Sequence, residues 1–167
     1  MNEQEIIAEV QAMMEKAVAS HQMGDRRAAR SLYQAVLEKV PRYSHARNLL
    51  GLLAHQEGRN DVAERLIGSA VDLKPDDAQY RLNLARVLID MGKLTEAHAM
   101  LESAFELAPQ LSEVFLLKGN LMMELGSGEE AFEQYCKVAE IEPDNPVIQN
   151  NLGNACKLMG RYPDALE

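Results

Sequence analysis

The chain has 167 residues, and its 26 acidic side chains outnumber its 17 basic ones to give a net charge of −9, so we expect no nucleic-acid partner. Its hydrophobic content of 47% is enough to bury helix faces, but no segment is apolar for long enough to predict a membrane span. Residues 1–10 carry three glutamates and do not resemble a signal peptide.

The predicted elements are helices that come in pairs, because apolar residues recur at helical spacing between Gly and Pro interruptions. The first pair is predicted at 5–23 and 26–39, with residues 2–9 extending the first helix. The second pair begins at Ser44 and at Asn60. In chain order, the later helices are predicted at 77–91, 94–107, 112–125, 128–141 and 145–159, and a last one begins near Tyr162.

The second pair shows why each helix begins and ends. We expect Ser44 to cap its first helix and Asn60 or Asp61 to cap its second, because short polar side chains accept hydrogen bonds from the first turn. Gly58 should end the first helix and Pro75 the second. The predicted buried face of the second helix is Val62, Ala63, Leu66, Ile67 and Ala70, and small residues, Gly51 among them, fall where the two helices approach.

The helix pair repeats every 34 residues. Three residue types recur at this step without exception: Pro at 41, 75, 109 and 143, Gly at 24, 58, 92, 126 and 160, and Ala at 29, 63, 97, 131 and 165. A fixed period of this size is typical of a solenoid, in which each unit buries its apolar face against the next. The units predicted in this register are 10–43, 44–77, 78–111, 112–145 and an incomplete 146–167, preceded by a helical extension at 1–9.

This pattern resembles the tetratricopeptide repeat (TPR). Several of the positions that this family constrains recur in phase here, including the small residue at position 8 (Ala17, Gly51, Ala85, Gly119 and Gly153) and the alanine and proline series above. The large residue at position 4 occurs only as Met13 and Phe115, and Lys16 and Lys118 depart from the pattern at position 7. The resemblance implies an all-α, right-handed superhelical solenoid of helix-turn-helix repeats, formed by the whole chain as one array.

The resemblance also implies a concave groove that is lined by the first helix of each unit. Transferred position by position, the expected partner-binding residues are His45, Asn48, Leu52, His55, Gln79, Leu82, Asn83, Arg86, Ile89, Glu113, Leu116, Asn120, Met123, Asn150, Asn151, Asn154 and Lys157. Among these, Arg86, Asn120 and Asn154 would bond a peptide backbone or carboxylate. Others would only pack against the neighbouring repeat.

Two known kinds of TPR array help to narrow the expected partner. A clamp for the C-terminal carboxylate of a chaperone uses Lys at position 5, which no unit has, so we expect no such clamp. Arrays that precede O-GlcNAc-transferase-like glycosyltransferase domains carry groove asparagines at position 6, which Asn83 and Asn151 match.

The charges are unevenly distributed along the chain. Residues 24–65 have a net charge of +3, whereas residues 94–145 have a net charge of −9. The ordinary interpretation is a solvated outer surface. The alternative is head-to-tail attraction between molecules or electrostatic steering of a charged partner.

The sequence offers little for catalysis. His21 and His55 share a repeat position and His45 is expected near them, but solvated groove histidines are a simpler interpretation than a metal or acid–base site. Cys136 and Cys156 have no zinc-like spacing and are expected to be free, buried or semi-buried thiols in a reducing compartment, which predicts a cytoplasmic location. We therefore expect no enzyme activity, cofactor or metal.

Three functions remain open at this point. The first is a non-catalytic scaffold that binds a peptide or partner protein in the groove. The second is the substrate-recognition arm of a longer glycosyltransferase or sulfotransferase, because the last unit stops after about one turn of its second helix. The third is a self-assembling module, in which a second copy covers that incomplete unit to form a homodimer.

Overall fold

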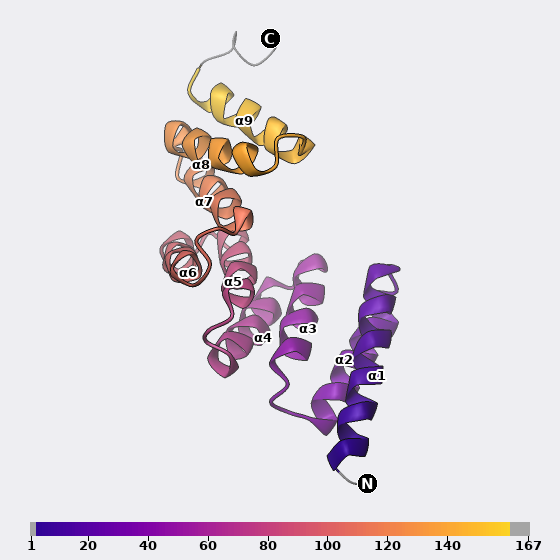
Figure 1. Cartoon of the computed structure of the whole chain (residues 1–167). Coiled ribbons are helices and arrows are strands. Elements are labelled where there is room, and N and C mark those ends of the chain that lie inside the picture. The colour runs from indigo at the N-terminus through magenta and orange to yellow at the C-terminus, as the bar shows by residue number, and fades with distance from the viewer. Residues whose placement is uncertain (1–2, 161–167) are drawn as a thin grey trace. The chain divides into compact units, whose positions relative to one another are not determined.

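The computed structural model describes residues 3–160, and within this range it consists of helices joined by short turns, with no strand (Figure 1). The helices are α1 (Glu3–Gln22), α2 (Arg26–Lys39), α3 (Ser44–Gln56), α4 (Asn60–Leu73), α5 (Ala78–Asp90), α6 (Leu94–Leu107), α7 (Ser112–Glu124), α8 (Gly128–Ile141) and α9 (Pro146–Leu158). The predicted class, an all-α solenoid of helix-turn-helix repeats, is confirmed. The short helix expected from Tyr162 lies outside the described residues. Across residues 3–160, the structure contains no helix that is long and apolar enough to cross a membrane.

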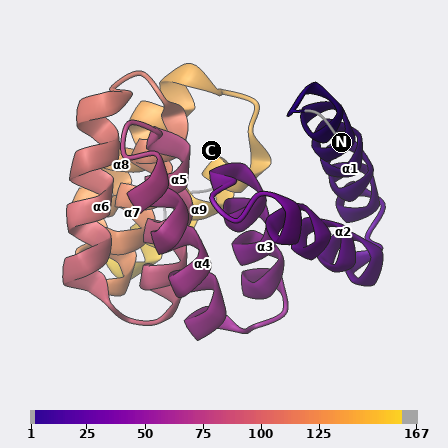
Figure 2. The ribbon, with the colours of Figure 1, turned by 90° about the horizontal axis from the view of Figure 1, so that it is seen from below.

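The helices form two compact units. Unit 1 ends at Asn83 and unit 2 begins at Leu84, so the boundary falls inside α5. In unit 1, α2 packs against α1 and α3, and α3 packs against α4; in unit 2, α7 packs against α6 and α8, and α8 packs against α9 (Figure 2). That all the repeats belong to one array stays a prediction.

The turns within each helix pair depend on glycine. Gly58 follows α3 with a φ of 73°, a left-handed conformation that a Cβ atom would strain, and Gly126 takes the same role after α7 with a φ of 76°. The predicted end of the first helix at Gly58 is therefore confirmed. Pro75 follows the C-cap residue of α4, Lys74, as expected for a residue that cannot continue the helix.

The expected helix caps were wrong. Tyr43, not Ser44, is the N-cap of α3, and Arg59, not Asn60 or Asp61, is the N-cap of α4; neither cap residue makes a side-chain hydrogen bond to the first turn. Ser44 is instead the first helical residue, and its Oγ lies 3.5 Å from the Tyr80 hydroxyl oxygen. A cap contributes only about 1 kcal/mol, so a helix that packs against its neighbours can begin without one.

Small residues let the paired helices approach closely. A Cβ atom on Gly51 would collide with Ile67, and one on Gly119 would collide with the ring of Tyr135 at the corresponding place in unit 2. Ala63, Ile67 and Ala70 are fully buried as predicted. Val62 and Leu66 are only half-buried, because they line a surface pocket between α2, α3 and α4.

Candidate functional site

The structure gathers five of the predicted groove residues around one pocket of about 600 Å³ in unit 1. This pocket lies between α3 and the first half of α5, and we call it the α3–α5 pocket. Its lining residues are Tyr43, Ser44, His45, Asn48, Leu49, Leu52, Lys74, Asp77, Gln79, Tyr80 and Asn83. Its volume is within the range of sites that bind small molecules or short peptide segments.

Two asparagine amides pair within the pocket wall. Nδ2 of Asn83 donates a hydrogen bond to Oδ1 of Asn48 at 3.0 Å, and Nε2 of Gln79 donates to Oδ1 of Asn83 at 3.5 Å. Asn48 and Asn83 are 3% and 4% exposed. Because burying an amide is costly unless it is hydrogen-bonded, this pairing offsets the burial of two polar side chains between α3 and α5.

The turn between the two repeats supplies charged groups to the pocket. Nζ of Lys74 lies 2.9 Å from Oδ2 of Asp77 and 5.9 Å from the ring centroid of Tyr80. The other oxygen of Asp77 accepts a hydrogen bond from the backbone N–H of Tyr80 at 3.3 Å. The hydrogen bond to Asp77 raises the pKa of the Lys74 ammonium, so this group stays charged at neutral pH.

His45 adds a neutral polar group to the lining. Partial burial lowers the pKa of its imidazole below the usual value, although the negative charge of Asp77 acts in the opposite direction. The ring is therefore predominantly uncharged at neutral pH and offers one hydrogen-bond donor and one acceptor.

Two predicted ligand residues of unit 2 already have partners within the chain. Arg86 on α5 forms an ion pair with Glu113 on α7. Oδ1 of Asn120 accepts a hydrogen bond of 2.8 Å from the hydroxyl of Tyr135. The structure thus gives Arg86 and Asn120, expected as ligands for a peptide, partners within the chain.

The remaining predicted residues differ in exposure. Leu82 is fully buried and Ile89 is 9% exposed, so both serve as core residues in this structure. Leu116 and Met123 are half-buried and pack against the core of unit 2. Leu52, His55 and Asn151 are half-buried, whereas Asn150, Asn154 and Lys157 are exposed on the surface of α9.

His21, one of the histidines considered for a metal or acid–base site, contacts side chains of two neighbouring helices. Nε2 of His21 lies 3.0 Å from Oε1 of Gln56, and its Nδ1 lies 3.3 Å from the Tyr33 hydroxyl, so this histidine joins α1 to its neighbours. Among residues 3–160, no cluster of three or more His, Cys, Asp or Glu side chains is arranged to hold a metal ion. Cys136 and Cys156 are free and half-buried, as predicted.

Sequence reasoning missed six residues of the α3–α5 pocket: Tyr43, Ser44, Leu49, Lys74, Asp77 and Tyr80. The transferred positions lie only on the first helix of each repeat, whereas Lys74 and Asp77 belong to the turn between repeats. Their position on either side of Pro75, just before the helix that carries Gln79, was the available signal.

Comparisons with known proteins give a consistent family. Three models described as tetratricopeptide repeats match residues 14–78, 54–121 and 119–160. The search of curated proteins gave no match.

Solved structures share the fold. The chain is similar to a solved structure of Pseudomonas aeruginosa pilF, with a TM-score of 0.84 and 19% identity, over 96% of this chain and 73% of that one. It is also similar to an O-GlcNAc transferase mutant from Thermobaculum terrenum, with a TM-score of 0.75 and 27% identity, over 84% of this chain and 27% of that one. A third similar structure is the first TPR of Spaghetti (RPAP3) bound to the HSP90 peptide SRMEEVD, with a TM-score of 0.65 and 21% identity, over 70% of this chain and 93% of that one.

Proposed function

The chain belongs to the tetratricopeptide-repeat family, and we propose that it is a non-catalytic scaffold that binds an extended peptide segment of a partner protein in the α3–α5 pocket. The observation that carries this proposal is the exposed amide of Gln79 in the lining of a pocket of about 600 Å³, where the buried pair of Asn48 and Asn83 forms part of the wall. Side-chain amides bond the N–H and C=O groups of an extended backbone without requiring a particular peptide sequence.

The other lining groups indicate what the segment would contain. Leu49 and Leu52 offer apolar contacts to a side chain of the peptide, while Lys74 and Asp77 stand at the rim and favour a polar neighbour. The structure of the similar TPR with an HSP90 peptide supports a peptide as the ligand class. No unit of this chain has the Lys at position 5 expected of a chaperone-tail clamp, so we propose a different peptide.

The experiment selects peptides from a random phage-displayed library on the full chain and measures their affinity for pocket variants. We expect His45→Ala and Gln79→Ala each to weaken the selected peptides by several-fold, because both exposed side chains line the pocket. The helical signal in circular dichroism should stay unchanged.

Asn154→Ala and Lys157→Ala serve as controls, because both side chains are predicted groove residues that are exposed on α9, outside this pocket. Peptides that bind every variant as tightly as the native chain would contradict the α3–α5 pocket as the site. Peptides that lose affinity only with the α9 variants would move the site to unit 2.

A second candidate function is the substrate-recognition arm of a longer glycosyltransferase. It is favoured by the 27% identity to the O-GlcNAc transferase structure, of which this chain matches 27% of the length. Reading the gene downstream of codon 167 tests it: a catalytic domain in the same frame supports an arm, and a stop codon contradicts it. The α3–α5 pocket would then select protein substrates rather than scaffold partners.

A further inference from the structure

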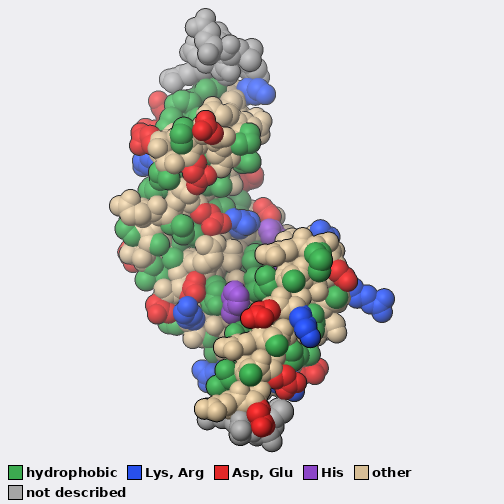
Figure 3. Space-filling view, turned by 45° about the vertical axis from the view of Figure 1, so that its right-hand side comes forward, with side chains coloured by type: hydrophobic (Ala, Val, Ile, Leu, Met, Phe, Trp, Pro, Cys, Tyr) green, Lys and Arg blue, Asp and Glu red, His purple; other side chains and the backbone are tan. Residues whose placement is uncertain are grey.

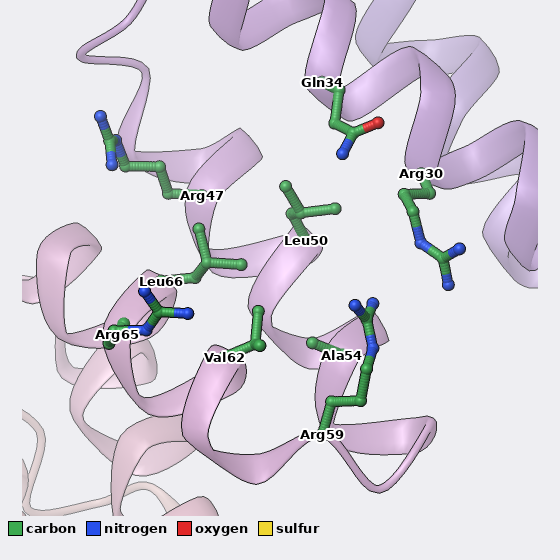
Figure 4. A pocket seen from close by; sticks show the side chains of 9 residues that line it. All are labelled: Arg30, Gln34, Arg47, Leu50, Ala54, Arg59, Val62, Arg65 and Leu66. Carbon is green, nitrogen blue, oxygen red and sulfur yellow. The ribbon is translucent and has the colours of Figure 1, made fainter.

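Unit 1 contains a second pocket, which the predicted groove residues do not line. It has a volume of about 400 Å³ and lies between α2, α3 and α4. Its apolar floor includes Leu50, Val62 and Leu66, and four arginines surround that floor, as Figure 4 shows. We call it the arginine pocket; its rim is formed by Arg30, Arg47, Arg59 and Arg65.

The lining of this pocket is positively charged, because none of its nine residues is acidic. Glu57 lies nearby and forms ion pairs with both Arg30 and Arg59, although it does not line the pocket. The guanidinium groups of Arg47 and Arg65 donate hydrogen bonds to the backbone carbonyl oxygens of Pro41 and Asp61.

Despite those contacts, the arginines of the pocket keep positive charge and hydrogen-bond donors that can bind an anion. A backbone carbonyl orients a guanidinium group but does not neutralise its charge. Nε of Arg30 is buried and has no hydrogen-bond partner among the described residues. The remaining donors form the planar fork that matches a carboxylate group.

Unit 2 shows that the repeat does not require these arginines. The corresponding pocket between α6, α7 and α8 has no arginine in its lining; its charged residues are three glutamates, Glu102, Glu130 and Glu133, and two lysines, Lys118 and Lys137. At equivalent repeat positions, Arg47 corresponds to Phe115 and Arg65 to Glu133. The fold therefore forms the hollow, while the positive charge is particular to unit 1.

The surface charge also argues against general attraction of anions. The net charge of the chain is −9, and on the face drawn in Figure 3 acidic and basic side chains are interspersed. A local positive pocket on an acidic protein selects a ligand that reaches the arginines at short range, because salt screens charges separated by more than about 10 Å. The apolar floor further favours a ligand with an apolar side chain over a simple inorganic anion.

We infer that the arginine pocket binds a short acidic segment of a partner protein, in which Asp or Glu residues flank one large apolar side chain. The apolar side chain covers Leu50, Val62 and Leu66, and the flanking carboxylates meet the arginines on either side. This site is distinct from the α3–α5 pocket, so one partner could engage both pockets or two partners could bind at once.

The test measures fluorescence anisotropy of a labelled peptide of alternating Glu and Leu residues with the full chain. We expect saturable binding that weakens with added salt. The double variant Arg47→Gln/Arg65→Gln should reduce the affinity by about tenfold or more, since charge-assisted hydrogen bonds are the strong ones in such contacts. These two substitutions leave the ion pairs of Glu57 in place.

The matched control is Arg26→Gln/Arg27→Gln, which removes the same charge from two exposed arginines on α2 outside the pocket. It should bind like the native chain. Loss of affinity in the control pair equal to that in the pocket pair would overturn the proposal, and so would the absence of binding.

Two further experiments test other occupants of the arginine pocket, namely a simple anion and a second copy of the chain. A peptide of alternating Glu and Ser that binds as tightly as the Glu and Leu peptide would overturn the role of the floor and leave a simple anion site. Light scattering without peptide tests a second copy, whose residues 94–145 carry a net charge of −9. If the chain self-associates in a salt-sensitive way and Arg47→Gln/Arg65→Gln abolishes this association, the occupant of the arginine pocket is a second copy of the chain and not a partner segment.

Discussion

Nδ2 of Asn83 on α5 donates a 3.0 Å hydrogen bond to Oδ1 of Asn48 on α3, and both amides are almost completely buried. The two residues belong to successive 34-residue repeats, so this bond joins the first helices of two neighbouring repeats. It also places amide groups in the wall of the proposed peptide site.

Removing one asparagine of this pair should destabilise the chain by more than the net contribution of a hydrogen bond, because its buried partner is left unpaired. Asn83→Ala leaves the buried carbonyl group of Asn48 without its partner, and we expect a loss of about 1–3 kcal/mol in the free energy of unfolding. The double variant Asn48→Ala/Asn83→Ala should be less destabilised than the sum of the two single variants. Urea denaturation of all four proteins measures this coupling, and strictly additive losses would contradict it.

Gly119→Ala should destabilise the chain, because the added methyl group would collide with the ring of Tyr135. We expect a loss of about 1–3 kcal/mol from overpacking. Gly68→Ala is the matched control, since Gly68 also lies within a helix and has open space where its Cβ would be. That variant should be neutral or more stable by up to about 1 kcal/mol. Equal effects of the two substitutions in thermal denaturation would show that helix propensity, not the close contact, governs position 8.

Alkaline pH should destabilise the chain through Tyr135. Burial raises the pKa of Tyr135 to about 12, above the value of 10 that a tyrosine has without such burial. The stability that this shift contributes is fully present below pH 10 and is lost as the pH rises towards 12.

Tyr135→Phe removes this titration along with the hydrogen bond to Asn120. The variant should therefore be less stable at pH 8 but should lose less stability than the native chain between pH 10 and 12. Denaturation at pH 8, 10 and 11.5 measures both effects. Burial also raises the pKa of Tyr33, and the hydrogen bond to Asp77 raises the pKa of Lys74; both groups remain in both proteins and contribute to the residual pH dependence.

The ion pair of Arg86 and Glu113 should contribute little to stability. Their side chains are 40% and 25% exposed, and exposed pairs contribute at most about 1 kcal/mol. We expect the double-mutant cycle of Arg86→Gln and Glu113→Gln to give a coupling below that value, and 1 M NaCl to reduce it further. A coupling that is larger and unaffected by salt would show that the pair is effectively shielded from solvent.

The sequence by itself determined the repeat, the helix pairs and their close contacts. These features follow from local backbone chemistry and from a period that recurs in phase: the glycine that ends a first helix, the proline that follows a second, and the small residue at position 8. Each depends on a few residues near one another in the chain, so a single sequence is enough to find them.

Only the tertiary structure decided which candidate residues share a site. Asn48 and Asn83 line one pocket, Arg86 and Asn120 each bind another residue of unit 2, and Leu82 is buried. All five occupy groove positions in the sequence pattern. The four arginines of the arginine pocket come from α2, α3, the N-cap of α4 and α4 itself, and they meet only because those helices pack together. Which side chains pair and which are buried depends on residues that are distant in the sequence. The repeat register positions the backbone of each helix but does not specify those side-chain contacts.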